Sequence, residues 1–365
     1  MTKSHKKKVL HVITGLEAGG GAETMLLRVL PHLKKTENVV CCMIPKGEIA
    51  HKLQQKGVEV YSLNMQSKLD VRGIWRYRKI IKEVRPDIQI NYLIHADIFG
   101  RIFGWLFGAS KIIAFIRNRH EELLYKFAER LTLPIIDCLL TNSPATMQFY
   151  KENYSLPDCR NVLPNGVAVP DRDKLKSEYL FDKLSIEKND QIITCVARLH
   201  KQKNHDTLLK TFGKLQRDYP DTKLLLCGDG PREKELRQLA HRLEIADNVL
   251  FLGHRDDINE ILNITDVFVL PSLFEGMSNA LLEAMAMERA CVVSDIPENT
   301  ELITDKDNGL TVEAGNSNDL HKTLQRLLDD KNLQDKLGKK ALAKIKESYS
   351  TYAERKRFDN FLATL

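Results

Sequence analysis

Two glutamates, Glu275 and Glu283, stand in a segment whose pattern predicts an anion-binding site. Seven residues separate them, and the segment follows the apolar run 267–270, which is typical of a buried strand. Residues 276–279 lie where a helix should begin, so their backbone N–H groups have no partner within that helix. A helix start of this kind attracts negative charge. Taken alone, Glu283 would more often be an ordinary acid on an amphipathic helix.

Two cations follow a second strand-like run. Arg198 and Lys203 come shortly after the run that ends at Val196. A diphosphate leaving group requires positive charge beside it, and these two side chains can supply it together with the helix start at 276–279. As an isolated pair, the same two residues would be read as a solvated part of the surface.

A glycine-rich loop follows the first strand-like run. It extends from Gly15 to Gly21 and opens a helix at about residue 22, so its backbone N–H groups could approach a phosphate. The loop does not fit a nicotinamide fingerprint, because Thr24 stands where the third glycine is needed and the second strand ends without a ribose-binding acid. A tight turn without a ligand is the alternative.

These loops must be positioned by alternating strands and helices, a pattern that predicts two doubly wound parallel-sheet α/β domains. Ligands of such sheets bind beyond the carboxyl ends of the strands. Turn formers and prolines in 163–173 predict a linker, which divides the chain into a first domain at 1–167 and a second domain at 168–349. The expected strands are 9–13, 39–44, 58–63, 88–93, 112–116, 138–141, 192–196, 223–227, 249–252, 267–270, 291–294 and 310–312.

Composition is that of a globular protein with an uneven charge. Residues 1–170 carry 25 Lys+Arg against 15 Asp+Glu, a net charge of +10, which leaves −4 for the rest of the chain. The seven cysteines are odd in number and have no CxxC spacing, so they are expected to be reduced core thiols of a cytoplasmic protein. No stretch has the length and apolar content of a membrane-spanning helix.

Taken in order, the motifs resemble those of glycosyltransferase family 4, a group of retaining enzymes with the two-domain GT-B fold. The resemblance covers nearly the whole chain and is most specific in the paired-glutamate segment after Val-Leu-Pro-Ser. Met277 and Ser278 depart from the Phe or Leu and the Gly that are frequent there in the family. The other matches are Arg198, Lys203, Gly228-Asp-Gly230-Pro231, Phe251-Leu-Gly253, Gly20-Gly21-Ala-Glu23 and Pro164-Asn165-Gly166.

The resemblance implies a role for each matched residue. Glu275 would hold hydroxyl groups of the donor sugar, Glu283 the ribose, and Arg198 and Lys203 the departing diphosphate. His95, after the fourth strand, is similar to the family histidine that touches the donor sugar and the reaction centre, although a lone histidine there is often structural. Arg117 and Asn118 would contact the acceptor. Further donor contacts would be Gly20, Gly21, Gly228, Gly253, Gly276, Met277, Ser278 and Asn279.

The activity implied by the resemblance is retaining transfer of a hexose or N-acetylhexosamine from a nucleotide diphosphate sugar, with a UDP-sugar as the first choice. The acceptor would be a saccharide or lipid-linked saccharide of a bacterial cell-envelope polysaccharide. The first domain would bind the acceptor and the second the nucleotide. The terminal helix at 350–365 would cross back to the first domain. No nucleic-acid partner is expected.

No metal or other cofactor is expected, because protein cations would neutralise the diphosphate. The two DxD pairs, at 171–173 and 305–307, lie in a linker and a polar turn. Two other classes stay open: a catalytically silent sugar-nucleotide-binding protein, which slow donor hydrolysis would exclude, and a nicotinamide-dependent oxidoreductase, which lacks its fingerprint.

A basic and aromatic segment suggests contact with the inner face of the cell membrane. Residues 72–85 read as a helix with six basic residues and one acid, with Trp75 and Tyr77 as interfacial aromatics. Aromatic and basic side chains alternate again from Phe99 and Arg101 to Lys111. The alternative is that the apolar residues of 72–85, Tyr77 among them, form a core face and the cations a solvated one.

Overall fold

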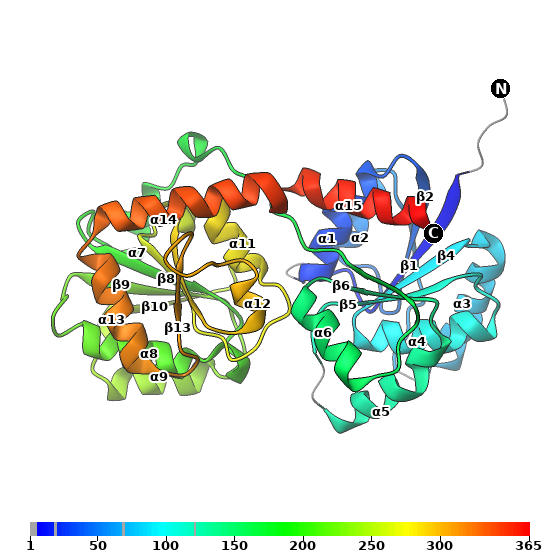
Figure 1. Ribbon diagram of the computed structural model, residues 1–365, viewed down its shortest axis with the longest axis horizontal. Coiled ribbons are helices and arrows are strands. Elements are labelled where there is room, and N and C mark those ends of the chain that lie inside the picture. Colours follow the sequence, from blue (N-terminus) through cyan, green and yellow to red (C-terminus); the bar gives the residue numbers. More distant parts are fainter. Residues whose placement is uncertain (1–5, 18–19, 68–69, 120–121) are drawn as a thin grey trace. The chain divides into compact units, whose positions relative to one another are not determined.

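The chain forms two compact α/β units (Figure 1). The computed structural model describes residues 6–17, 20–67, 70–119 and 122–365. One unit comprises Met1–Asn165 together with Thr351–Leu365, and the other comprises Gly166–Ser350. The chain thus leaves the first unit within the predicted linker and returns to it after Ser350. Each unit is built on one parallel sheet.

The first unit has a seven-stranded sheet in the order β3-β2-β1-β4-β5-β6-β7. Six of its strands confirm the predicted runs to within a few residues. The seventh, β7, was not predicted, because it is an edge strand with little apolar content and mostly accessible side chains. The strands are β1 Lys7–Ile13, β2 Thr36–Cys42, β3 Glu59–Ser62, β4 Ile88–Tyr92, β5 Ile112–Ile116, β6 Cys138–Thr141 and β7 Cys159–Val162.

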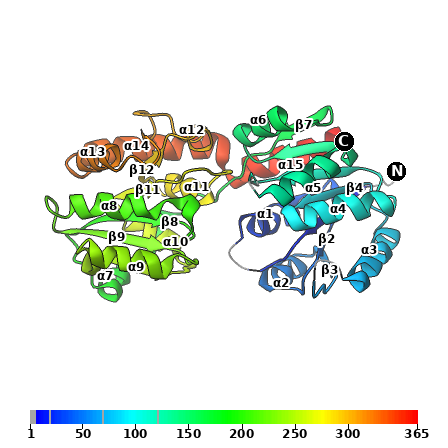
Figure 2. The ribbon, with the colours of Figure 1, turned by 90° about the horizontal axis from the view of Figure 1, so that it is seen from below.

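Helices cover both faces of this sheet (Figure 2). On one face lie α1 (Gly21–Val29), α2 (Glu48–Gln55) and α15 (Thr351–Thr364). The other face carries α3 (Val71–Val84), α4 (Ile94–Leu106) and α6 (Pro144–Asn153), while α5 (Leu123–Thr132) packs on α4.

Part of the predicted interfacial segment belongs to the core. Tyr77, Phe99 and Arg101 are buried, so the expectation that they face a membrane is wrong. The helical period places Tyr77 on the same face of α3 as Ile80 and Ile81, which pack on the sheet. Trp75 points away from that face and is exposed.

The terminal helix α15 is part of the first unit's core. Phe358, Phe361 and Leu362 are buried with residues of α1 and α2. A bidentate ion pair joins Arg28 of α1 to Glu354, with Nε to Oε2 at 2.7 Å and Nη2 to Oε1 at 3.0 Å. Apolar packing and a fork-shaped ion pair therefore hold this segment to the first unit.

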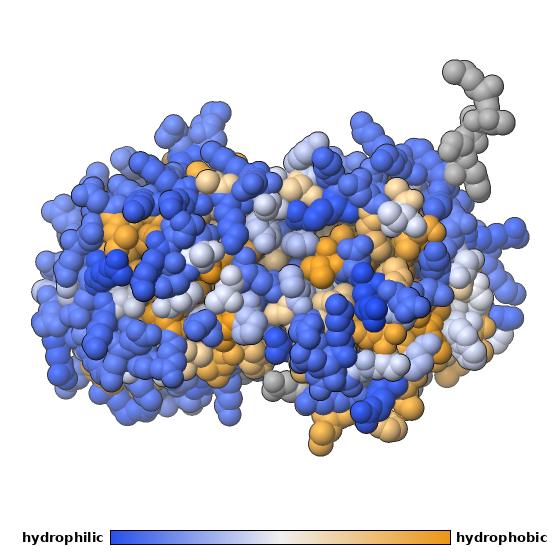
Figure 3. Space-filling view, in the orientation of Figure 1, coloured by the Kyte–Doolittle hydropathy of each residue, from blue (hydrophilic) through white to orange (hydrophobic). Residues whose placement is uncertain are grey.

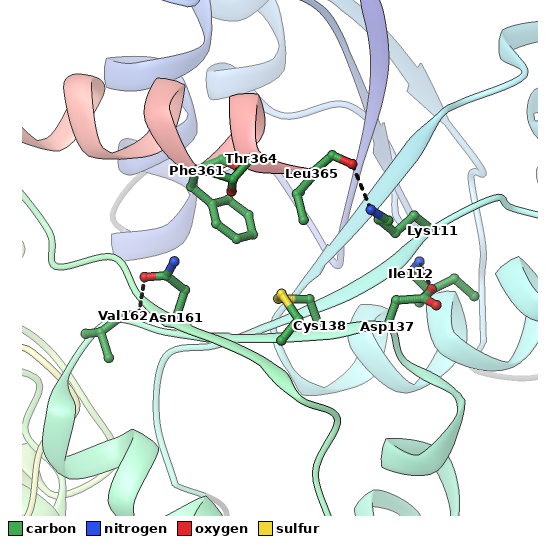
Figure 4. The surroundings of a disulfide bond; sticks show 10 residues. Lys111, Ile112, Asp137, Cys138, Asn161, Val162, Phe361, Thr364 and Leu365 are labelled. Atoms are coloured by element: carbon green, nitrogen blue, oxygen red, sulfur yellow. Dashed lines mark hydrogen bonds between the residues drawn. A yellow bond between two sulfur atoms is a disulfide. The ribbon is translucent and has the colours of Figure 1, made fainter.

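A disulfide joins Cys138 of β6 to Cys159 of β7 (Figure 4). The prediction that all seven cysteines are reduced is wrong for this pair. The two residues are direct partners in the register of neighbouring strands, with their Cα atoms 4.6 Å apart. Chain spacing gave no sign of this, because the pairing depends on the strand that was not predicted. The five other cysteines are free and buried.

The second unit has a six-stranded parallel sheet in the order β10-β9-β8-β11-β12-β13. All six strands were predicted. Strands β8 and β11 are central neighbours, so the loops that follow them leave the same edge of the sheet. The strands are β8 Gln191–Val196, β9 Thr222–Cys227, β10 Val249–Gly253, β11 Val267–Leu270, β12 Ala290–Ser294 and β13 Leu310–Val312.

Helices α8 (His205–Leu215), α9 (Glu233–Arg242) and α13 (Ser317–Leu328) cover one face of the second sheet. The other face carries α7 (Tyr179–Leu184), α10 (Ile258–Asn263) and α11 (Asn279–Ala286), with α14 (Lys331–Lys344) beside α11. A short α12 spans Pro297–Thr300, and a π-helical turn, Ile345–Tyr349, follows α14. Of the helices in the described residues, none combines the length and apolar content needed to span a bilayer.

Candidate active site

The loops after β8 and β11 are joined by hydrogen bonds at one edge of the second sheet. The backbone N–H of Leu273 donates to the carbonyl of Gln202 at 2.8 Å, and Nε2 of Gln202 donates to the carbonyl of Phe274 at 2.7 Å. Gln202 lies in the short 3₁₀ turn Lys201–Lys203. These bonds bring Lys203 beside Glu275, although the two are 72 positions apart in the chain.

Glu275 is buried and paired. It is 5% exposed, forms an ion pair with Lys203 through Oε1, and accepts a 2.6 Å hydrogen bond from the Ser272 hydroxyl at the same oxygen. Among the described residues, no donor reaches Oε2. Because a buried carboxylate needs compensating donors, the contacts of Lys203 and Ser272 at Oε1 offset the burial of Glu275 and leave Oε2 to accept from a ligand.

Arg198 is an uncompensated cation at the same sheet edge. Its backbone is fixed between neighbouring loops, since the Leu199 N–H donates to the carbonyl of Asp229 at 2.7 Å. The side chain is exposed, and within the described part of the chain its guanidinium makes no hydrogen bond or ion pair. A solvated arginine on a fixed backbone is suited to bind an anion.

Glycines allow the loops after β9 and β10 to approach this edge closely. Gly228 has φ +136°, and a Cβ at this position would lie 2.2 Å from the carbonyl oxygen of Ala197. Its N–H donates to the carbonyl of Gly253 at 2.7 Å. Gly228 and Gly253, predicted to contact the donor, therefore lie beside the Arg198 loop, and Gly228 is required for that packing.

The start of α11 lies next to Glu275. Ser278 is the N-cap residue, and its hydroxyl accepts from the N–H of Leu281 at 3.3 Å. Gly276 and Met277 precede it, and the Met277 side chain packs in the apolar core. The helix itself begins at Asn279, and Glu283 is partly exposed one turn further on. A neutral hydroxyl thus caps a helix start whose dipole favours an anion.

The helix start in the first unit is different. Gly20 is the N-cap residue of α1, while Ala18 and Gly19 of the same loop lie outside the described residues. The carboxylate of Glu23 lies at this helix start, where a Cβ added at Gly20 would come within 2.0 Å of its Oε2, and burial raises its pKa. Gly20 and Gly21, predicted to meet a phosphate, therefore lie at a helix start that already holds its own carboxylate.

Arg117 joins three segments of the first unit. Its Nη2 donates to the carbonyl of Gly21 at 3.2 Å and to Oδ1 of Asn165 at 2.8 Å, and burial lowers its pKa to about 10. The Asn118 side chain accepts from the N–H of Arg119 at 2.9 Å. Both predicted acceptor contacts thus follow β5, and Arg117 reaches the glycine loop.

His95 lies in the first turn of α4, directly after β4. Leu93, two residues before His95, has φ +61°, an unusual conformation for a residue other than glycine. The centroid of the imidazole lies 5.6 Å from that of the Tyr125 ring on α5. Strained backbone of this kind clusters at functional sites, which agrees with the position that the sequence assigned to His95.

The two DxD pairs have protein partners. Asp171 pairs with Lys174 at 2.7 Å and Asp307 with Lys340 at 2.5 Å, while Asp305 Oδ1 accepts from the N–H of Thr311 at 3.0 Å. Within the described ranges, no three His, Cys, Asp or Glu side chains converge as a metal site would require.

Four residues that shape these sites were missed in the sequence: Ser272, Gln202, Glu23 as a helix cap, and Tyr125. Ser272 and Glu23 stand inside motifs that were recognised. Glu at the third helical position is a known capping pattern and could have been read directly. The bonds of Gln202 and Tyr125 join distant segments and leave no local signal.

Family models match both halves of the chain. The model described as Glycosyl transferases group 1 matches residues 176–344, and that described as Glycosyltransferase Family 4 matches 19–169. An Escherichia coli UDP-Gal:alpha-D-GlcNAc-diphosphoundecaprenol alpha-1,3-galactosyltransferase is 30% identical over 285 residues, covering 72% of each chain. A Campylobacter jejuni N-acetylgalactosamine-N,N'-diacetylbacillosaminyl-diphospho-undecaprenol 4-alpha-N-acetylgalactosaminyltransferase is 28% identical over 349 residues, covering 90% of this chain and 92% of the relative.

A solved structure has the same architecture. Anabaena HepE, crystallised with UDP and glucose, matches with a TM-score of 0.86 and 19% identity, over 98% of this chain and all of that one. Together with the two parallel-sheet units, this match confirms the expected GT-B fold.

Proposed function

The chain belongs to glycosyltransferase family 4 and is a glycosyltransferase, and we propose that it moves a hexose or N-acetylhexosamine from a UDP-sugar to a lipid-linked saccharide with retained anomeric configuration. The observation that carries this proposal is the arrangement of an unpaired Arg198 beside the Lys203–Glu275 ion pair. It offers positive charge for a diphosphate and a carboxylate oxygen for a sugar hydroxyl at one sheet edge.

The first step is loss of the nucleotide diphosphate. Arg198, Lys203 and the start of α11 stabilise the charge that grows on the departing phosphate. Oε2 of Glu275 accepts from a hydroxyl of the sugar and orients the ring, while Glu283 holds the ribose. The bond between the anomeric carbon and the phosphate oxygen then lengthens towards an oxocarbenium-like state.

The acceptor hydroxyl attacks the face that the phosphate leaves, and a phosphate oxygen takes its proton, so configuration is retained. In this proposal, Lys203 and Ser272 hold Oε1 of Glu275, and its Oε2 accepts from a sugar hydroxyl and does not attack the anomeric carbon. Both relatives named above form alpha linkages, which front-face transfer from an alpha-linked donor produces.

The donor and acceptor classes rest on the relatives. The Escherichia coli relative is named for a UDP-Gal donor, and both relatives are named for diphosphoundecaprenol-linked saccharides. We place the acceptor in the first unit, where His95 and Arg117 follow neighbouring strands. The reaction would take place in the cytoplasm, where nucleotide sugars are made, during synthesis of a cell-envelope polysaccharide.

Protein cations take the part that a divalent metal plays in other transferases, so we propose metal-independent transfer. A silent nucleotide-sugar-binding protein of the same fold is the second candidate. A silent binding protein would need no carboxylate to orient the sugar. Lys203 and Ser272 hold Glu275 in place, and this favours the enzyme.

The test combines donor and acceptor panels. The chain is incubated in EDTA with UDP-Glc, UDP-Gal, UDP-GlcNAc, UDP-GalNAc or GDP-mannose and a detergent-dispersed undecaprenyl-diphosphate saccharide. Nucleotide release and the mass of the acceptor are measured. We expect release from one UDP-sugar with a matching mass gain. Activity only after addition of Mn²⁺ would overturn metal independence, and absence of turnover with every donor would favour the silent protein.

A further inference from the structure

Helix α5 is oriented with its polar side towards the protein. Only Glu129 and Thr132 of its ten residues are buried. Its large apolar side chains are accessible: Leu123 is 84%, Leu124 72%, Phe127 63% and Leu131 61% exposed. These four lie within one arc of the helix, at i, i+1, i+4 and i+8. A surface helix of a globular protein normally does the opposite and buries its apolar stripe.

A network of buried polar groups holds α5 in this orientation. The Glu129 carboxylate accepts from the hydroxyls of Tyr150 at 2.5 Å and Tyr154 at 3.1 Å. Thr132 accepts from Nη1 of Arg101 at 3.1 Å, and Arg101 is itself paired with Asp97 inside the fold. Turning α5 over would bury leucines at the expense of these bonds and leave charged groups unpaired, so the outward apolar face is built into the fold.

The neighbouring helices extend the apolar surface. Helix α4, on which α5 packs, exposes Ile102, Trp105 and Leu106, and α3, which packs on α4, exposes Val71 and Trp75. Figure 3 shows apolar surface on the lower part of the first unit, where Figure 1 places α5. We call the exposed apolar residues of α3, α4 and α5 the docking surface. Monomeric proteins rarely expose so many large apolar side chains together.

Cations line the docking surface. Lys126 and Arg130 lie along one edge of the apolar arc of α5, and both line a groove with Phe127 and Phe149. On α3, Arg78 lies over the Trp75 ring at 5.3 Å, while Lys79 and Lys82 are exposed nearby. The acids of these helices do not cancel this charge, because Asp97 and Glu129 are buried and bonded. Among the described residues this leaves Asp70 at the start of α3, Glu83 on α3 and Glu122 at the start of α5.

We propose that the docking surface inserts into the interface of an anionic lipid bilayer, with α5 lying in the interface plane and the cations of α3 and α5 meeting lipid phosphates. Leucine, phenylalanine and tryptophan beside lysine and arginine form the composition of an interfacial helix. The charge complementarity favours lipid over a second copy of this basic surface. This inference rests on the proposed function for its purpose, since a lipid-linked acceptor lies in such a bilayer. Through Tyr125, the same helix contacts His95.

Sedimentation with vesicles tests the docking surface without donor or acceptor. The full chain is mixed with vesicles of neutral phosphatidylcholine or with vesicles that also contain anionic phosphatidylglycerol, at low and high salt. We expect the chain to pellet with anionic vesicles and to be partly released by salt, which screens the cations. Equal absence from both pellets at low salt would overturn the proposal.

Matched variants distinguish the contribution of apolar insertion to vesicle binding from that of the cations. The combined substitution Leu123→Ser, Leu124→Ser and Phe127→Ser should lower the partition coefficient at least about tenfold, because it removes apolar area that inserts. Lys126→Gln with Arg130→Gln should lower it by about fivefold for each cation. The controls are Tyr352→Ser and Lys34→Gln, exposed residues of the same unit outside the docking surface, which should bind as the wild type does.

Two further measurements keep the outcomes distinct. Transfer to a detergent-dispersed acceptor should be retained by the serine variant, so loss of vesicle binding with retained transfer supports the surface, whereas vesicle binding without any transfer contradicts only the proposed function. Sedimentation equilibrium identifies a competing occupant. A wild-type dimer that the serine variant abolishes would show that the surface binds a second copy, and would overturn the assignment to lipid.

Discussion

The two units present opposite charges at comparable helix starts. In the second unit, α11 is capped by the neutral hydroxyl of Ser278, and an unpaired Arg198 is exposed at the same sheet edge. In the first unit, the carboxylate of Glu23 lies at the start of α1 beside Gly20, and the nearby Arg117 donates to Gly21 and Asn165. Both starts carry the backbone dipole, but the one in the first unit already has an acidic side chain beside it.

This difference assigns the ligands more sharply than the motifs do. The glycine loop of the first unit looks like a phosphate site in sequence, yet the carboxylate of Glu23 lies beside Gly20 there. We therefore propose that the donor diphosphate binds at Arg198 and Lys203. The first unit is better suited to a neutral hydroxyl, as an acceptor sugar provides.

The largest expected effect follows loss of the unpaired cation. Arg198→Ala should slow transfer by roughly 10²- to 10³-fold with the fold intact, because one preorganised contact to the leaving group is removed. Arg217→Ala, an exposed arginine of the same unit, is the control and should keep wild-type turnover. Near-normal transfer by a folded Arg198→Ala protein would remove the assignment of the leaving-group site.

Each unit also buries one histidine, and acid should destabilise both. Burial is the main cause that lowers the pKa of His11 and of His205 from 6.5 to about 4. Because the unfolded chain binds the proton first, each site should lose about 3 kcal/mol of stability as pH falls from 6.5 to 4. Urea unfolding at several pH values between 6.5 and 4 measures this loss in the free energy of unfolding.

The units can be followed separately in that experiment. Both tryptophans, Trp75 and Trp105, lie in the first unit, so fluorescence reports its unfolding while circular dichroism reports both units. His11→Gln should flatten the acid dependence of the fluorescence transition, and His205→Gln only that of the dichroism. If the free energy of unfolding of both variants depends on pH as it does in the wild type, the acid sensitivity does not come from His11 and His205.

A smaller effect concerns the glycine behind the Arg198 loop. Gly228→Ala should destabilise the second unit by roughly 1–3 kcal/mol, since a Cβ would meet the Ala197 backbone at a positive φ. Gly213→Ala is the matched control, because Gly213 lies inside α8 and its added Cβ would make an ordinary 3.6 Å contact with Leu243. That change should stabilise by roughly 0.5–1 kcal/mol. Equal changes in the stability of the two variants would show that Gly228 does not pack closely on the Ala197 backbone.

The smallest effect is expected at Glu23. Its pKa is raised above 4.5 by burial, so the charged form is disfavoured, and its contribution to stability is present below pH 4.5 and lost as pH rises through the folded pKa. Wild type should therefore gain stability relative to Glu23→Gln in acid, and the two should differ by less than about 1 kcal/mol at pH 7. If urea unfolding shows that wild type loses stability relative to Glu23→Gln in acid, the fold favours the ionised form of Glu23.

The sequence predicted what depends on local pattern. Buried parallel strands are short apolar runs, so twelve of them were found, whereas the accessible edge strand β7 was not, and the Cys138–Cys159 pair was lost with it. The positions of Glu275, Arg198 and Lys203 after strands were read correctly. Their ion pair was not, because it joins residues of distant loops.

The orientation of α5 shows most clearly what local sequence does not predict. An apolar stripe such as Leu123, Phe127 and Leu131 predicts a helix with one apolar side, but the pattern is the same whether that side faces the core or solvent. The outcome depends on partners elsewhere in the chain, here Tyr150 for Glu129 and Arg101 for Thr132. The sequence of α5 alone does not predict those contacts.

Affinity for UDP in the full chain tests the contrast between the two helix starts most directly. Isothermal titration is compared for wild type, Arg198→Ala and Glu23→Gln. We predict that Arg198→Ala weakens UDP binding about tenfold or more, the value of a charged hydrogen bond, while Glu23→Gln leaves it within about twofold. Unchanged affinity in Arg198→Ala, or a large gain in Glu23→Gln, would contradict the account by placing the diphosphate at the first unit's glycine loop.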